Sequence, residues 1–130
     1  MKLFVDDIRK APDESWTVAQ NVSAAVRLLE AYWPQITEVS LDHDISHYEN
    51  LDENDVDQNV QACGEDFQAV ARYMAMVRKY TLAQLVTDAR YSKAYQGFNP
   101  KITVHTSNHE GAQRISDILK AASFTDIYTI

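Results

Sequence analysis

The chain has 130 residues, of which 45% are apolar and 24% charged, a balance typical of one soluble globular domain and not of a disordered segment. Its formal net charge of -7 excludes a surface-wide attraction to nucleic acid or anionic lipid, so a nucleic acid is expected to be engaged only locally, at an end. The only cysteine, Cys63, leaves no internal disulfide, and no stretch is long enough for a signal peptide or a membrane span. These features favour a cytoplasmic protein.

Two short strands and one amphipathic helix are predicted in the first third of the chain. Residues 2–5 form an apolar run that indicates a buried strand, and residues 16–19 have the composition of a second strand. A helix is expected to follow, with Asn21 or Ser23 as its cap. The prediction rests on apolar residues that recur at helical spacing: Val22, Val26, Leu29 and Trp33.

The middle of the chain is predicted to hold the central strand, residues 39–41, and two further segments that enlarge this part of the chain. The first is an acidic insertion at about 46–63, which we expect to be a solvated loop. It matches a calcium-binding loop poorly, because Val60 stands where that loop requires glycine. The second is an extra helical piece at about 81–94. It follows a helix whose core face comprises Phe67, Val70, Ala71, Met74 and Val77.

The last third of the chain completes an alternation of strands and helices. A strand is predicted at 102–104, then a helix with Ile115 and Leu119 on its apolar face, then a closing strand at 127–130. This alternation predicts a single domain, residues 1–130, with a flavodoxin- or receiver-like three-layer α/β sandwich. Its five-stranded parallel sheet is expected to have the order 2-1-3-4-5, with helices on both faces.

Ionisable side chains follow three of the predicted strands at the point where each strand ends. Asp6 and Asp7 follow the first strand, residues 42–44 (Asp-His-Asp) follow the third, and His105 follows the fourth. In a sheet of this order the site lies at the carboxyl ends of the strands, beside the switch point between strands 1 and 3. For residues 42–44 alone, a polar loop after a strand is an equal alternative. The repetition at three strand ends favours a site.

Asp6, Asp7 and Asp42 are the candidate metal ligands. Three clustered carboxylates repel one another unless a cation neutralises them, and hard oxygen ligands favour Mg²⁺ or Mn²⁺ over zinc. Asp44 is a fourth candidate ligand, although it is also placed to orient His43 or to cap the loop. The alternative is that one or two of these carboxylates cap backbone groups instead.

Two histidines and a hydrogen-bonding segment supply the remaining candidates. His43 and His105 are expected to act with Asp42 in catalysis, as general acid and base in an order that the sequence leaves open. The candidate phosphate-binding residues are Arg9 and three residues just before a predicted helix, whose N-terminus attracts anions: Thr106, Ser107 and Asn108.

Three motifs together resemble the cyclic-phosphate processing receiver-like family. They are Val-Asp-Asp-Ile-Arg at 5–9, Leu-Asp-His-Asp at 41–44, and Val-His-Thr-Ser-Asn at 104–108 followed by Gly111. Gly-Glu-Asp at 64–66 is similar to that family's helix start. The resemblance implies a receiver-like fold and a role in processing cyclic phosphates, such as RNA or nucleotide 2',3'-cyclic phosphate ends, in RNA repair.

The expected function is therefore that of a metal-dependent phosphoesterase, a hydrolase acting on a small phosphorylated substrate or an RNA end. No extended nucleic-acid groove and no membrane partner are expected. Two alternatives remain open: a receiver-type signalling module with Asp42 as the phosphoacceptor-like residue, and a non-catalytic interaction module that binds a protein partner through the acidic insertion. His43, directly beside Asp42, departs from ordinary receivers and makes the signalling module the second choice.

Overall fold

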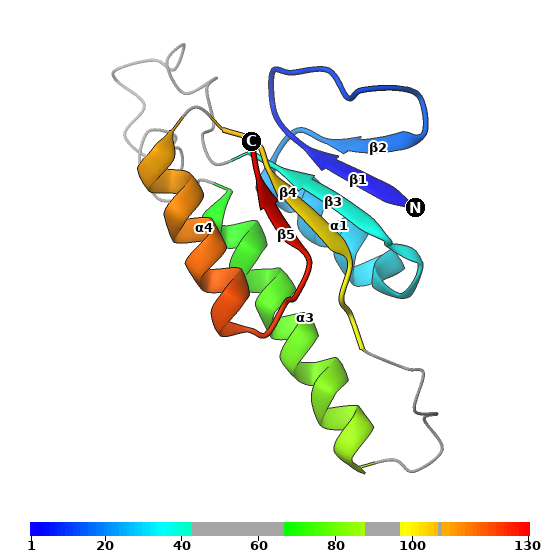
Figure 1. The fold of residues 1–130 in the computed structure, drawn as a ribbon. Helices are drawn as coiled ribbons and strands as arrows, with labels where there is room; N and C mark the ends of the chain where they lie inside the picture. Colours follow the sequence, from blue (N-terminus) through cyan, green and yellow to red (C-terminus); the bar gives the residue numbers. More distant parts are fainter. Residues whose placement is uncertain (43–66, 88–96, 107) are drawn as a thin grey trace, which may run out of the picture.

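A computed structural model of the chain describes residues 1–42, 67–87, 97–106 and 108–130 (Figure 1). The elements in chain order are β1 (Lys2–Val5), β2 (Trp16–Ala19), α1 (Val22–Tyr32), the 3-10 helix η1 (Trp33–Gln35), β3 (Glu38–Leu41), α3 (Gln68–Thr87), β4 (Lys101–Val104), α4 (His109–Ala121) and β5 (Ile127–Thr129). None of these described helices combines the length and the apolar character that crossing a membrane requires.

The strands form one parallel sheet of order β2-β1-β3-β4-β5, which confirms the predicted receiver-like order. Its register brings the strand ends level: Val5 pairs with Leu41, and Leu41 pairs with Val104. β1 and β3 are neighbours although β2 lies between them in the sequence, so the predicted switch point is present. The three central strands therefore end side by side at one edge of the sheet.

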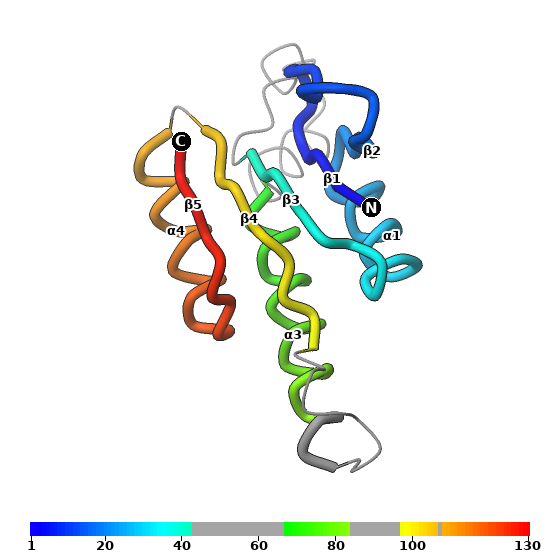
Figure 2. The backbone as a smooth tube through the Cα atoms, turned by 45° about the vertical axis from the view of Figure 1, so that its right-hand side comes forward, coloured from blue at the N-terminus to red at the C-terminus, as the bar shows by residue number. Residues whose placement is uncertain are grey.

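The three described α-helices lie on one face of the sheet (Figures 1 and 2). The connections β2–β3, β3–β4 and β4–β5 all run in the same direction across the sheet, and right-handed crossovers in one direction place their helices on the same face. α3 lies between α1 and α4 and contacts both. The core beneath them includes alternate strand residues: Leu3, Val5, Val39, Leu41, Ile102 and Val104.

The opposite face of the sheet carries the other alternate residues, including Phe4, Ser40 and Thr103, which share one register level. The connection from β1 to β2 runs the other way across the sheet, and residues 6–15 form it without a helix. Within the described part of the chain, the second helical layer of the predicted sandwich is therefore not formed.

Helix α1 begins where the sequence predicts, with Asn21 and not Ser23 as its cap. The Asn21 side-chain oxygen accepts a hydrogen bond from the Ala24 backbone N–H at 2.8 Å, which satisfies one donor of the first turn. Ala25 and Leu29 are its buried residues. The α-helix stops at Tyr32, and Pro34 lies in the short 3-10 helix that follows.

Helix α3 is a single helix of 20 residues, whereas the sequence predicts two helical pieces here. The predicted core face is confirmed, since its five residues are all buried: Phe67, Val70, Ala71, Met74 and Val77. Residues 81–87 continue the same helix, because no glycine or proline interrupts the chain there. The rest of the predicted extra piece, residues 88–94, and the acidic insertion at 46–63 lie outside the described residues.

Candidate functional site

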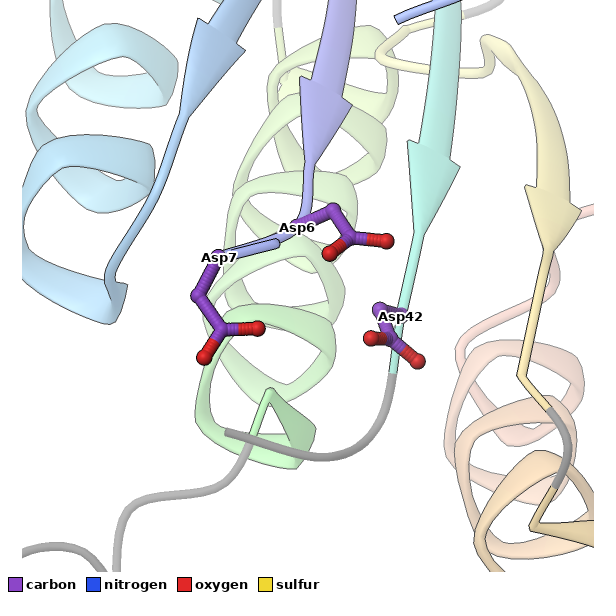
Figure 3. Close-up of side chains that lie close together, drawn as sticks. All are labelled: Asp6, Asp7 and Asp42. Carbon is purple, nitrogen blue, oxygen red and sulfur yellow. The ribbon is translucent and has the colours of Figure 1, made fainter. Parts of the chain in front are cut away.

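Three carboxylates gather around a common space beyond the ends of β1 and β3 (Figure 3). Asp6, Asp7 and Asp42 each offer one oxygen, and these three oxygens lie within 4.8 Å of one another. Asp6 and Asp42 are buried, with 1% and 5% of their surface exposed, and Asp7 is partly buried. The structure thus brings together the three predicted metal ligands that it describes.

The register of the sheet explains why these side chains meet. The backbone N–H groups of Asp6, Asp42 and His105 continue the hydrogen-bond ladder by one residue, to carbonyl oxygens on the adjacent strands at 2.9–3.1 Å. Side chains alternate between the two faces of a sheet, so these three residues lie on the face that carries Phe4, Ser40 and Thr103. The site is therefore at the edge of the face opposite the helices.

Both ring nitrogens of His105 contact polar side chains inside the protein. Its Nε2 lies 2.9 Å from Asp6 Oδ2, and its Nδ1 lies 2.7 Å from Ser40 Oγ. The imidazole stacks on the Phe4 ring, with 4.8 Å between centroids and 8° between planes. Only 7% of the residue is exposed. Both ring nitrogens are therefore engaged inside the protein, and the ring has one orientation.

Sequence reasoning missed Ser40 and Phe4. A signal for both was available: Ser40 precedes Asp42 by two positions and Phe4 precedes Asp6 by two, so strand alternation places all four on the same face. Strand alternation alone does not show that β1 pairs with β3 and β3 with β4. These pairings bring Phe4 and Ser40 close to His105.

Asp6 is fixed through both of its carboxylate oxygens. Oδ1 accepts hydrogen bonds from the backbone N–H groups of Ile8 and Arg9, each at 2.9 Å, and so caps the start of the 6–15 connection. Oδ2 accepts the bond from His105. A carboxylate oxygen has two acceptor sites, so Oδ2 keeps a second one for the cluster. Asp6 thus combines the capping role considered for these carboxylates with a position in the acidic cluster.

Arg9 carries positive charge to the edge of the cluster. Its Nη1 donates a hydrogen bond to the His105 carbonyl at 3.2 Å and lies 3.8 Å from Asp6 Oδ2 and 3.9 Å from Asp42 Oδ1. Half of the side chain is exposed, so an incoming anion has access to it. Three ionised carboxylates and one guanidinium leave two negative charges, which one divalent cation neutralises.

The predicted phosphate-binding segment after β4 organises the start of α4. Asn108 Oδ1 accepts a hydrogen bond from the Gly111 N–H at 2.9 Å, and Thr106 Oγ1 accepts one from the Asn108 N–H at 3.2 Å. These contacts give both residues a local structural role, and their contact with phosphate stays a prediction. Ser107, and likewise His43 and Asp44, lie outside the described residues.

Comparison with protein families gives a match that spans nearly the whole chain. The family described as the cyclic-phosphate processing receiver domain matches residues 1–121, which run from the first residue to the last residue of α4. Comparison with curated proteins and with solved structures gives no match. The matched stretch includes every strand end that builds the acidic cluster. The chain therefore belongs to the family of cyclic-phosphate processing receiver domains.

Proposed function

We propose that this protein is a metal-dependent phosphoesterase that opens cyclic phosphate esters, with RNA or nucleotide 2',3'-cyclic phosphate ends as its substrates. The observation that carries the proposal is the convergence of Asp6, Asp7 and Asp42, with one oxygen of each within 4.8 Å of the others. The family description supports the link to cyclic phosphates. The single cysteine of the chain, Cys63, fits a reducing compartment, so we infer that the protein is cytoplasmic. The proposed role in RNA repair follows from the proposed substrates.

The donor set fits Mg²⁺ or Mn²⁺. All three donors are carboxylate oxygens, which are the ligands these ions prefer. One oxygen of each residue lies within 4.8 Å of the others, so Asp6, Asp7 and Asp42 would hold the ion together. Such an ion supplies Lewis-acid polarisation of a phosphoryl oxygen. Asp44, two residues after Asp42 in the sequence, is a further candidate ligand.

The chain's own residues would bind the phosphate and move the proton. Arg9, half exposed and 3.9 Å from Asp42, is placed to donate a charge-assisted hydrogen bond to a non-bridging oxygen. Thr106, Ser107 and Asn108 are proposed to assist it through hydrogen bonds. His43 remains the proposed proton carrier. His105 was predicted to share that task, but both of its ring nitrogens are engaged, which favours a role in holding Asp6.

A receiver-type signalling module is the second candidate. It is favoured by the burial of Asp42 at the end of β3, beside the acidic pair at the end of β1, in a sheet of receiver order. In that case Asp42 would accept a phosphoryl group, and beryllium fluoride with Mg²⁺ would shift its neighbours' NMR signals. A protein partner at the acidic insertion, residues 46–63, remains a prediction from the sequence.

Phosphorus NMR with a nucleoside 2',3'-cyclic phosphate tests the phosphoesterase directly. We expect the cyclic resonance to give way to a monoester resonance with wild-type protein and Mn²⁺ or Mg²⁺. The conversion should stop with EDTA or in Asp42→Asn. A parallel sample with a glycerol cyclic phosphate separates nucleotide from sugar-phosphate specificity. An unchanged spectrum with both substrates and both metals would contradict the proposal.

A further inference from the structure

A buried chain of hydrogen bonds crosses three strands beneath the acidic cluster. It runs from Ser40 Oγ on β3 to His105 Nδ1 after β4, at 2.7 Å, and from His105 Nε2 to Asp6 Oδ2 after β1, at 2.9 Å. The exposed fractions of the three residues are 7%, 7% and 1%. The imidazole therefore reaches over β3, which lies between β1 and β4 in the sheet.

When the His105 imidazole is neutral, its two hydrogen bonds have one direction. An ionised carboxylate is only an acceptor, so Nε2 carries the hydrogen that is donated to Asp6 Oδ2. Nδ1 is then the acceptor nitrogen, and the Ser40 hydroxyl is its donor. The Ser40 bond thus selects the one tautomer that supports Asp6. The stacked Phe4 ring fixes the plane of the imidazole at the same time.

The same three residue types form the nucleophilic triad of many hydrolases, but the surroundings here do not suit that chemistry. Ser40 lies inside β3, which is paired on both sides with β1 and β4. Its neighbouring backbone N–H groups belong to that paired sheet and do not form a hole for an oxyanion. With 7% exposure, Ser40 also presents little surface to a substrate.

We propose that Ser40 and His105 are positioning residues for the metal ligand Asp6. Asp6 Oδ1 is held by two backbone N–H groups and Oδ2 by His105, so the carboxylate cannot rotate and its remaining acceptor site stays with the cluster. A ligand that is already oriented loses less freedom on binding. The inference rests on the proposed metal site, and it replaces proton transfer by His105 with support of Asp6.

Calorimetric titration with Mn²⁺ tests the role of Ser40. Loss of an outer hydrogen-bond partner of a metal ligand typically weakens metal binding about 10- to 100-fold, and we expect Ser40→Ala to fall at the lower end of that range. Ser40→Thr keeps the hydroxyl and should recover most of the affinity. Thr103→Val is the matched control, because it removes a hydroxyl at the same register level outside the chain of bonds. Equal affinity in Ser40→Ala and wild type would overturn the proposal.

His105 variants separate positioning from proton transfer. His105→Gln keeps an N–H donor that can reach Asp6, so its Mn²⁺ affinity should fall less than that of His105→Ala. Its turnover of a nucleoside cyclic phosphate should recover as Mn²⁺ is raised to saturation, since only ligand support is weakened. Turnover that stays lost in His105→Gln at saturating Mn²⁺ would overturn the positioning role and assign proton transfer to His105.

The outcomes also distinguish this inference from the proposed function. If wild type binds Mn²⁺ and Ser40→Ala weakens that binding, but no cyclic phosphate is opened, the phosphoesterase is wrong and the positioning role stands. If the phosphate is opened and Ser40→Ala binds Mn²⁺ as wild type does, the positioning role is wrong and the phosphoesterase stands. A wild-type protein that binds neither Mn²⁺ nor Mg²⁺ overturns both.

Discussion

His105 Nε2 lies 2.9 Å from Asp6 Oδ2 although β1 and β4 are not neighbours in the sheet. Adjacent strands are about 4.8 Å apart, so the imidazole spans the width of β3 to reach the carboxylate. This contact joins the two outer strands of the site above the central one. Asp6, a member of the acidic cluster, is therefore held by a residue that follows a non-adjacent strand of the sheet.

Asp7→Asn should stabilise the metal-free protein and reduce its response to metal. In EDTA the variant has one fewer carboxylate in a cluster whose members repel one another, so its Tm should rise by a few degrees. At Mn²⁺ concentrations about 100 times the wild-type Kd, the wild type should gain about 2.7 kcal/mol, and the variant much less. Scanning calorimetry with and without Mn²⁺ measures both effects.

Glu30→Gln is the matched control for that prediction, since it removes the same charge from an exposed position on α1. It should leave the Mn²⁺-induced rise in Tm unchanged. If Asp7→Asn lowers Tm in EDTA and responds to Mn²⁺ as the wild type does, the three carboxylates do not act together on a metal.

Arg9→Ala should change phosphate binding and metal binding in opposite directions. Loss of a charge-assisted hydrogen bond of about 1.5–3 kcal/mol should weaken inorganic phosphate binding to the Mn²⁺-loaded protein by about 10- to 100-fold. Removal of a cation that lies 3.8 Å and 3.9 Å from two carboxylates should tighten Mn²⁺ binding. Because Arg9 is half exposed, that gain should not exceed about 1 kcal/mol.

Titration calorimetry with each ligand in turn checks both signs for Arg9. Lys10→Ala removes a positive charge from the next position, which is exposed, and should alter neither affinity appreciably. Phosphate binding that survives in Arg9→Ala would remove Arg9 from the site.

Asn108→Ala should destabilise the fold through the loss of the α4 cap. The Asn108 side chain accepts the Gly111 N–H at 2.9 Å, and removal of such a cap costs about 1 kcal/mol, or about 4 °C in Tm for a domain of this size. Asn108→Ser keeps a capping oxygen and should recover most of the loss in urea unfolding. If phosphate affinity also falls in Asn108→Ser, the amide has the predicted second role at the site.

Gly97→Ala should be destabilising for two reasons. Gly97 has a φ of +70°, which residues with a side chain rarely adopt, and an added Cβ would lie 2.8 Å from Thr81 Oγ1. Thr81 Oγ1 accepts the Phe98 N–H at 3.0 Å, so displacing it also disturbs the entry to β4. We expect a loss of about 1–3 kcal/mol in urea unfolding. An unchanged unfolding free energy would show that neither the conformation nor the contact is needed.

The sequence was sufficient to predict the sheet order and the meeting of Asp6, Asp7 and Asp42. Both follow from local apolar runs that end in charged residues, together with a general rule for parallel sheets. That all three described α-helices lie on one face of the sheet was not predictable in this way. It depends on the 6–15 connection, which includes Pro12 and forms no helix, and on the single direction of the other three crossovers.

The position of His105 was predicted, whereas its surroundings were not. Ser40 and Phe4 lie 65 and 101 residues from it in the sequence, and only the pairing of the strands brings them together. A histidine at one strand end and carboxylates at two other strand ends are enough, by residue type alone, to predict a chemical role for His105. Its engaged nitrogens, which decide between proton transfer and support of Asp6, are a property of the packed sheet.

A crystal structure of the protein grown with Mn²⁺ and inorganic phosphate tests the central claim most directly, through the anomalous signal of manganese. The expected result is one strong anomalous peak bonded to oxygens of Asp6, Asp7 and Asp42, with His105 still bonded to Asp6 and phosphate beside Arg9. A structure whose only manganese peaks lie away from these three carboxylates would contradict a metal-dependent site at this edge of the sheet.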